Sequence, residues 1–562
     1  MAELFDAPSA AFVFLMSTQE VQVAQDPEDE ISSSYPSSQP HTVTNKPYHL
    51  INADTLLDDF DDDGLDDTSR NRSSWLRDDD EGDENSVKYS IWVMYALGLV
   101  SHMNITIFLP SGVRFLTQFI DECKGIDLDV GMRYYGHECL AHSSIYFALS
   151  ISLFSLFQWL SAPLFQVLWK QLHPKSKLVF AVPLLLSIAG NVIYACSNGS
   201  AVYLVGRIVA GTGSSLTGVC FSYIMSVTSS DDRLEKIATY RVFCMVGVVL
   251  APILAIILSF GEVDLGSLTL NGYNTPALAM CLLYIIGGIM VVFFLKDMPP
   301  PRLIRNADED EYFFSPAVFF SLLLAFTVGA LSATFEWMYG PLGGIKWNWG
   351  VAQTGVALLV SSLFVFPGVL SEKILKKNDR VSKLGDRFFV LLGLGLLPSG
   401  LLILWVAFQS HFPDGGDDFD DPNSMGDDGQ VQHGGPSGGV GAGVLFVGGL
   451  ITFIVFTWIS SSLPAMLYSV VPPNARTKVM AMNTGMTLLG RFVGPAWASY
   501  TFSIENFEPD VMFMSMANLV GVCLFFALIF WQRIRPGAWT LSTSYSAPKD
   551  AEMEDYNDNS FS

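Results

Sequence analysis

The stretch from Tyr203 to Cys220 reads YLVGRIVAGTGSSLTGVC, and its composition favours a helix inside a membrane. Apolar residues dominate a length close to that of a bilayer crossing, and glycine and serine recur along it. Small residues let helix backbones approach closely, which is how helices pack in lipid. Arg207 interrupts the run, and a cation at the bilayer centre costs at least ~2.5–3.5 kcal/mol. We therefore expect Arg207 to face a central cavity, with snorkelling to the nearer surface as the alternative.

Half of the 562 residues in the whole chain are hydrophobic. Beyond this stretch the sequence contains further apolar runs, about twelve in all, each long enough to span a membrane. Such a pattern predicts an all-α polytopic membrane protein. The expected spans lie near 89–113, 143–168, 178–196, 201–228, 237–260, 275–296, 315–339, 350–371, 386–409, 443–469, 479–504 and 510–532.

The net charge of −24 is concentrated outside these spans. Residues 1–87 hold 21 acidic and 4 basic side chains, and residues 410–442 hold seven aspartates with no lysine or arginine. Both segments lack apolar periodicity, so we expect a disordered acidic tail and a disordered loop. The acidity therefore belongs to polar appendages and argues against a nucleic-acid partner.

Basic residues alternate between the connecting loops. Loops after even-numbered spans and the C-terminus hold twenty lysines and arginines, whereas loops after odd-numbered spans hold four. By the positive-inside rule both termini are cytosolic. The expected organisation is a tail at 1–87, an N-terminal six-helix half at 88–296, a linker at 297–314, a C-terminal half at 315–533 with a luminal loop at 410–442, and a cytosolic tail at 534–562.

Two short signals lie outside the spans. Tyr48-His-Leu-Ile51 fits the tyrosine-x-x-bulky pattern that vesicle-coat adaptor proteins read, although four-residue matches are common by chance. Cys123 and Cys139 share one hydrophilic loop and could form a disulfide if that loop is non-cytosolic.

Six plus six spans with cytosolic ends resemble the layout of the major facilitator superfamily, whose halves enclose a substrate near the midplane. The run from Arg207 through Gly211 to Gly213 is similar to the fourth-helix motif of that superfamily. Gly247 to Pro252 is similar to its fifth-helix motif, with alanine in place of the second glycine. The resemblance implies packing and conformational roles for these glycines.

The second half carries related strings. Gly490, Gly494 and Pro495 repeat the fifth-helix spacing in span eleven, and Gly368 with Glu372-Lys373 is similar to the superfamily's loop motif after helix two. The strings at 270–278, 335–342 and 467–469 are also similar to the ceroid-lipofuscinosis-type lysosomal members. That resemblance implies an endolysosomal or vacuolar membrane.

Four further polar residues fall inside spans. Arg491 sits about 18 Å into span eleven and is expected to face the cavity, or else to form a buried structural pair. Glu336 is either a proton-titrating acid or an interfacial carboxylate. His102 and Asn104 in span one are candidates for the pathway, with helix packing as the alternative.

Two arginines and one acid predict an anion pathway, because unpaired guanidinium groups in a low-dielectric cavity attract anions. We expect a secondary transporter of a small-molecule or inorganic anion, with H⁺ as the candidate coupling ion. An anion-selective channel and a non-transporting receptor are the alternatives. An enzyme is not expected, because the sequence shows no metal-ligand cluster, nucleophile elbow or phosphate loop. No cofactor is expected, and the remaining partners are membrane lipid and adaptor proteins at the N-terminal tail.

Overall fold

The computed structural model describes residues 81–530 with internal gaps. The gaps are 121–122, 124–136, 173–175, 229, 261–262, 266–267, 297–314, 348, 379–380, 382–383, 410–437, 472–475 and 505–509. The Tyr48–Ile51 string, the linker, most of the acidic tail and of the 410–442 loop, and the C-terminal tail lie outside the described residues.

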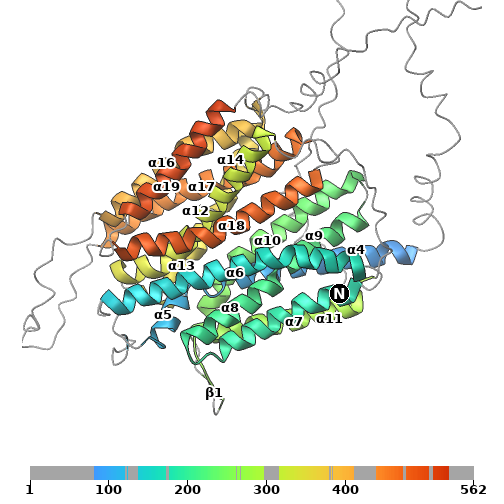
Figure 1. The fold of residues 1–562 in the computed structure, drawn as a ribbon, viewed down its shortest axis with the longest axis horizontal. Coiled ribbons are helices and arrows are strands. Elements are labelled where there is room, and N and C mark those ends of the chain that lie inside the picture. Colours follow the sequence, from blue (N-terminus) through green and yellow to red (C-terminus); the bar gives the residue numbers. More distant parts are fainter. Residues whose placement is uncertain are drawn as a thin grey trace, which may run out of the picture.

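Long helices running roughly side by side make up the described part of the chain (Figure 1). The N-terminal half contains α4 (Glu81–Thr106), α5 (Gly112–Thr117), α6 (His137–Leu172), α7 (Ser176–Ala195), α8 (Ser200–Ser214), α9 (Leu216–Val227), α10 (Ser230–Leu258) and α11 (Thr275–Phe294). The C-terminal half contains α12 (Pro316–Trp347), α13 (Val351–Leu363), α14 (Val365–Lys376), α16 (Asp386–Gln409), α17 (Gly438–Val470), α18 (Arg476–Ile504) and α19 (Asp510–Ile529).

Ten helical stretches among the described residues are long and apolar enough to cross a membrane. Helices α8 and α9 form one of them and α13 and α14 another, since a single residue separates each pair. The two remaining expected spans correspond to α4 and α18, which have the length but not the apolar composition. Helix α4 begins with an acidic run, and α18 carries Arg476, Lys478 and Arg491.

Two local features differ from the sequence expectation. The first span was expected to continue to residue 113, but α4 ends at Thr106 and a turn leads into α5. Pro110 accounts for this break, because proline has no N–H to donate and disfavours helical geometry in the residue before it. A short antiparallel hairpin also joins α10 to α11, formed by β1 (Val263–Leu265) and β2 (Leu268–Leu270).

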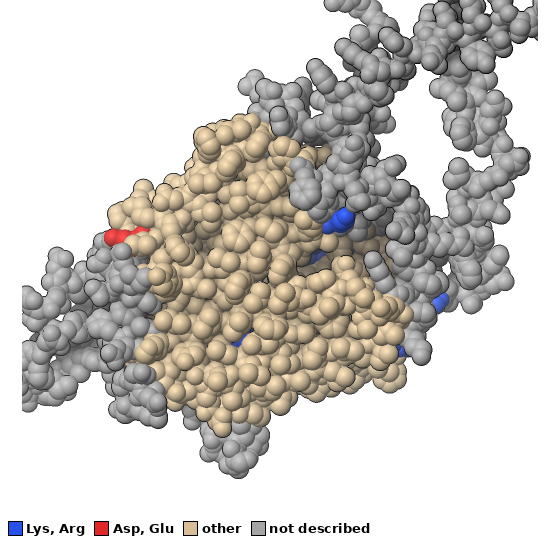
Figure 2. Space-filling model, in the orientation of Figure 1, with Lys and Arg blue, Asp and Glu red and all other residues tan. Residues whose placement is uncertain are grey.

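The outer surface suits lipid rather than water. Phe293, Leu164 and Leu185 are each more than 60% exposed on three different helices. Figure 2 shows a face that is almost wholly uncharged. Exposed apolar surface on this scale marks contact with a membrane or a partner, which agrees with a polytopic membrane protein.

One apolar core contains residues of both halves, and the N-terminal half contributes to it at one end of the bundle. This end carries α5 and the Cys123–Cys139 disulfide, and we call it the disulfide end; the end where α4 begins is the tail end (Figure 1). Phe108 and Phe147 of the N-terminal half belong to the same buried cluster as Trp337 and Leu342 of the C-terminal half. A second cluster draws its residues from the N-terminal half alone.

Candidate functional site

Helices α12 and α18 are in backbone contact, and glycines make this possible. A Cβ on Gly490 would collide with the carbonyl of Phe326, and one on Gly494 would collide with that of Ala330. On the α12 side of the contact, a Cβ on Gly329 would collide with the carbonyl of Thr487 on α18. Small residues at such positions are how membrane helices approach closely. The contact brings the residue after Gly490, Arg491, against the face of α12.

Arg491 forms a bidentate ion pair with Glu336. Its Nη1 and Nη2 donate to Oε1 and Oε2 of Glu336 at 2.8 and 2.5 Å, and Nη1 also donates to the hydroxyl of Ser332 at 3.2 Å. The two charged side chains are 13% and 20% exposed. The unpaired guanidinium expected at this position is therefore paired here. The physical reason is that a charge in a low-dielectric interior is stable when an opposite charge meets it.

Glu336 borders a cavity of about 140 Å³ between the two halves, and Arg491 reaches this cavity through its pairing with Glu336 rather than as a lining residue. Glu336 and Ser332 line this central cavity on the α12 side, and Pro252 lines it on the α10 side. The other lining residues are Thr106, Leu109, Val248, Phe335, Tyr339, Leu358, Ser361, Ser362, Val365, Thr452, Phe453 and Phe456. Tyr339 and Ser361 hydrogen-bond each other at 2.6 Å, so the wall mixes hydroxyl groups with apolar side chains.

Most of the other expected pathway residues lie apart from this cavity lining. The Nδ1 of His102 donates to the carbonyl of Gly98 at 2.9 Å, one turn back on α4. Asn104 is fully buried inside the N-terminal half, where its amide donates to Ser214 at 3.5 Å.

Arg207 is buried in the N-terminal half, 1% exposed. The carbon at the centre of its guanidinium lies 3.7 Å from the ring centroid of Phe108 and 4.3 Å from that of Phe154. Its Nε and Nη2 have no hydrogen-bond partner in the described part of the chain. The motif glycines that follow are also in close contacts, Gly211 with the backbone of Phe154 and Gly213 with Ser187.

Equivalent close contacts involve the fifth-helix motif. A Cβ on Gly247 would meet the carbonyl of Leu99 on α4, and Pro252 lies one turn further along α10, at the cavity. Pro495 lies inside α18, directly after Gly494.

A polar cluster surrounds Glu372 near the tail end. Its carboxylate accepts hydrogen bonds from Ser461 and Ser462 of α17 at 2.5 and 3.1 Å. Lys376 pairs with Glu372 at 2.8 Å and with Asp386 at 2.7 Å, which ties α14 to the start of α16. The sequence signal for Lys376 was its spacing of four residues from Glu372. The partner serines lie ninety residues away, and no local pattern points to them.

Gly368 and Lys373 belong to the same segment of α14. The carbonyl of Gly368 accepts a hydrogen bond from the Trp458 indole at 3.1 Å, and its Cα faces the side chain of Thr457. Lys373 follows Glu372 on α14 and is a partly exposed residue.

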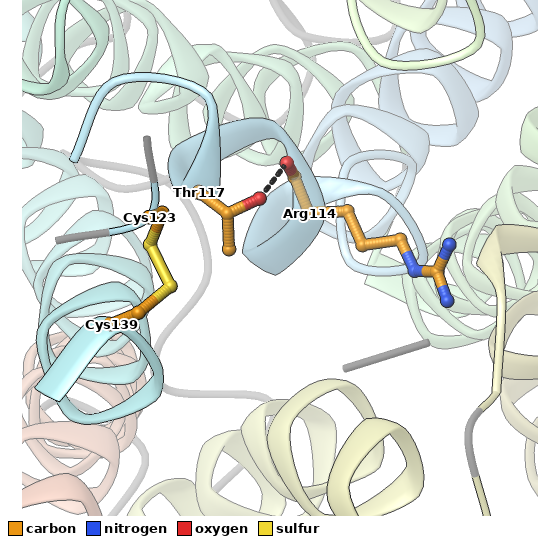
Figure 3. The surroundings of a disulfide bond; sticks show 4 residues. All are labelled: Arg114, Thr117, Cys123 and Cys139. Carbon is orange, nitrogen blue, oxygen red and sulfur yellow. Dashed lines mark hydrogen bonds between the residues drawn. A yellow bond between two sulfur atoms is a disulfide. The ribbon is translucent and has the colours of Figure 1, made fainter. Parts of the chain in front are cut away.

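Contacts at the disulfide end join the two halves. The Nη2 of Arg114, on α5, donates to the carbonyl of Trp349 at 3.2 Å. The Trp337 indole of α12 donates to the carbonyl of Ser144 on α6 at 3.3 Å. Figure 3 shows that the Cys123–Cys139 disulfide lies beside α5, where Thr117 donates to the carbonyl of Arg114. These contacts close the bundle at this end.

Comparisons with known proteins agree with this architecture. A protein 30% identical over 296 residues is major facilitator superfamily domain-containing protein 8 of Xenopus laevis, and the match covers 47% of this chain and 54% of that protein. The MFS-type transporter PUL3 of Kluyveromyces lactis is 27% identical over 197 residues, covering 33% of this chain and 42% of PUL3. The chain thus spans about half the length of the curated relatives it matches.

Two solved structures share the fold. The crystal structure of a D-xylose-proton symporter superposes with a TM-score of 0.57 at 11% identity, covering 78% of this chain and 97% of that one. The inward-open conformation of the xylose transporter XylE from E. coli superposes with a TM-score of 0.52 at 12% identity, covering 79% of this chain and 96% of that one. Identities this low show a common fold alone.

The family itself follows from a direct match. The model of the Major Facilitator Superfamily matches residues 91–414, which is more than half of the chain. Membership agrees with the expectation that the chain is not an enzyme. The chain belongs to the major facilitator superfamily.

Proposed function

We propose that this protein is a secondary transporter that moves a small anion across an endolysosomal or vacuolar membrane by alternating access, coupled to H⁺. The observation that carries the proposal is the ion pair between Arg491 and Glu336, a residue of the central cavity wall. A transporter needs a site between its halves, and this pair supplies a charged group there.

The pair links anion binding to proton binding. While Glu336 is ionised, its carboxylate occupies both terminal nitrogens of Arg491. A proton on Glu336 removes that competitor, so the guanidinium becomes available to an anion from the cavity. Binding of the proton and binding of the anion then favour each other, and this reciprocity is what coupling requires.

The protonated pair also leaves the cavity with a balanced charge. An anion beside Arg491 replaces the neutralised Glu336, so the loaded site carries no excess charge through the low-dielectric interior. Site occupancy by one anion and one proton is the expected loaded state.

The membrane topology belongs to the proposal. We infer twelve spans, with α4 and α18 crossing the membrane as polar helices inside the bundle, and both termini in the cytosol. The twenty-to-four distribution of basic residues supports this orientation. The Cys123–Cys139 disulfide supports a luminal disulfide end, because disulfides persist in oxidising compartments. The N-terminal tail then faces cytosolic adaptors, with Tyr48 and Ile51 as the sorting signal.

The central experiment is uptake into proteoliposomes that contain the full-length purified chain. Acetate, inorganic phosphate and chloride are tested separately, with and without an acidic exterior. We expect saturable uptake and counterflow of at least one anion, faster with the pH gradient, and loss of uptake in Arg491→Ala. Uptake that is the same in Arg491→Ala contradicts the proposed site, and single-channel currents in place of counterflow contradict the transporter mechanism.

A further inference from the structure

We propose that Arg207 forms a second anion site, inside the N-terminal half, for an oxyanion such as a carboxylate or phosphate group. The site is separate from the central cavity: Arg207 is absent from the cavity lining, and the rings that flank it lie in the N-terminal half. The proposal does not depend on whether the protein transports the same anion.

The free edge of Arg207 has the geometry of an oxyanion receptor. Nε and Nη2 are the two donors that lie side by side on one edge of a guanidinium, and both are without a partner here. Two parallel N–H groups match two oxygens of one carboxylate or phosphate, the bidentate arrangement that arginine forms best. Arg491 forms the corresponding arrangement with Glu336 through its other edge, Nη1 and Nη2.

The neighbours of Arg207 stack on the flat faces of its guanidinium, but none accepts a hydrogen bond from Nε or Nη2 in the described part of the chain. Phe108 and Phe154 stack on the guanidinium, and a ring face attracts the positive charge without accepting the in-plane N–H groups. The titratable groups that act on Arg207 most strongly are Tyr203, Tyr194 and Tyr284, none of which is a carboxylate.

A buried cation without a counter-ion is expensive, so a protein that merely needed packing here would gain by having an apolar residue. An arginine at this position is consistent with a group that receives an anion from outside the chain. The same reasoning predicts that removing the charge makes the anion-free protein more stable.

Access to the site runs past one turn of the chain. Phe108 covers Arg207, and the next residue, Leu109, lines the central cavity. Both belong to the turn between α4 and α5, where Ser111 and Gly112 donate back to the carbonyl of Phe108. Phe108 and Leu109 are neighbours on this turn, so one layer of side chains separates Arg207 from the cavity, and we expect an anion to reach Arg207 when the turn moves.

The test is thermal unfolding of the full-length protein in detergent, with sodium acetate or inorganic phosphate as the probe at constant ionic strength. We expect at least one probe to raise the Tm of the wild type saturably. Arg207→Lys keeps the charge but lacks the paired donors, so its apparent affinity is expected to fall by about tenfold or more. Arg241→Lys is the matched control, because Arg241 is an exposed residue of α10 outside both sites, and it is expected to keep the wild-type shift.

Arg207→Met keeps the hydrocarbon stem and removes the charge. We expect it to melt above the wild type without probe and to show no probe-dependent shift. Any of three results overturns the proposal. The first is a Tm of Arg207→Met below that of the wild type, and the second is a wild-type Tm that neither probe raises. The third is a Tm shift in Arg207→Lys as large as that of the wild type. Loss of the shift in Arg491→Lys alone places the anion in the central cavity, which overturns this site and leaves the proposed transport standing. If uptake into proteoliposomes fails while the Arg207-dependent shift persists, the proposed transport is overturned and the Arg207 site stands.

Discussion

Trp337 donates its indole N–H to the carbonyl of Ser144, 3.3 Å away, and so connects α12 of one half to α6 of the other. The donor is fully buried and is the residue directly after Glu336. The charged site and the closure of the disulfide end therefore lie on the same turn of α12. A change in the pairing of Glu336 that moves this turn also moves the contact that holds the halves together.

This relationship predicts the effect of Trp337→Phe. A smaller aromatic ring remains, and the hydrogen bond to Ser144 is lost. The loss of the hydrogen bond alone costs about 0.5–1.5 kcal/mol and shifts a two-state closure equilibrium by up to about tenfold. A cysteine placed at Thr106, in the cavity wall, is expected to react faster with a membrane-impermeant thiol reagent added from the disulfide end.

Trp458→Phe is the matched control, because the Trp458 indole donates to Gly368 within the C-terminal half. It is expected to leave the labelling rate at position 106 unchanged. Equal rates in Trp337→Phe and the wild type would show that this hydrogen bond does not contribute to closure.

The contact between α12 and α18 predicts a large effect of Gly490→Ala. The added Cβ meets the carbonyl of Phe326 and the amide of Ala330, and neither backbone atom can move without separating the helices. We expect a destabilisation of roughly 1–3 kcal/mol, as for overpacked cores, measured as a lower Tm in detergent.

Gly521→Ala provides the control in the same half. No atom lies within 4 Å of a Cβ at this position, and alanine is a better helix former than glycine. The Tm is expected to stay the same or rise. A Gly490→Ala protein as stable as Gly521→Ala would disprove the close-packing explanation.

The architecture could be predicted from the sequence because lipid imposes a simple rule. A helix that crosses a bilayer must be long and apolar, so spans such as Thr275–Phe294 stand out as continuous runs. The family motifs were also recognisable, because glycines at fixed spacing are visible in one dimension. Helices α4 and α18 gave weaker signals, since protein partners rather than lipid solvate their polar residues.

The pairing at the site could not be predicted in the same way. Arg491 and Glu336 are separated by 155 residues, and no local pattern says which acid meets which base. Ser332 had an available signal, because it lies four residues before Glu336 and so shares its helix face. The position of Arg207 among phenyl rings depends on the packing of α6, α8 and the turn between α4 and α5, which a single sequence does not state.

The ion pair predicts non-additive stability. Removing one partner, as in Arg491→Gln, leaves a charged Glu336 in a largely buried position. We expect a loss of about 3 kcal/mol, at the lower end for buried pairs because the side chains keep 13% and 20% exposure. The double variant Glu336→Gln/Arg491→Gln leaves no charge behind and is expected to melt above Arg491→Gln alone. Additive losses in the double-mutant cycle would mean that the two groups do not interact.

The disulfide predicts a specific loss at one end of the bundle. Cys123 and Cys139 are 16 residues apart, and a cross-link of that length contributes about 3 kcal/mol by restricting the unfolded chain. The bond also anchors the segment that carries Arg114, which donates to the carbonyl of Trp349. The double variant Cys123→Ser/Cys139→Ser is therefore expected to have a lower Tm. It is also expected to show faster thiol labelling of a cysteine at position 106 by reagent added from the disulfide end. Cys196→Ser is the control, because Cys196 is a free, exposed cysteine whose removal is expected to change neither measurement. A double-serine variant with the Tm and labelling rate of Cys196→Ser would show that the disulfide neither stabilises the fold nor holds α5 against the C-terminal half.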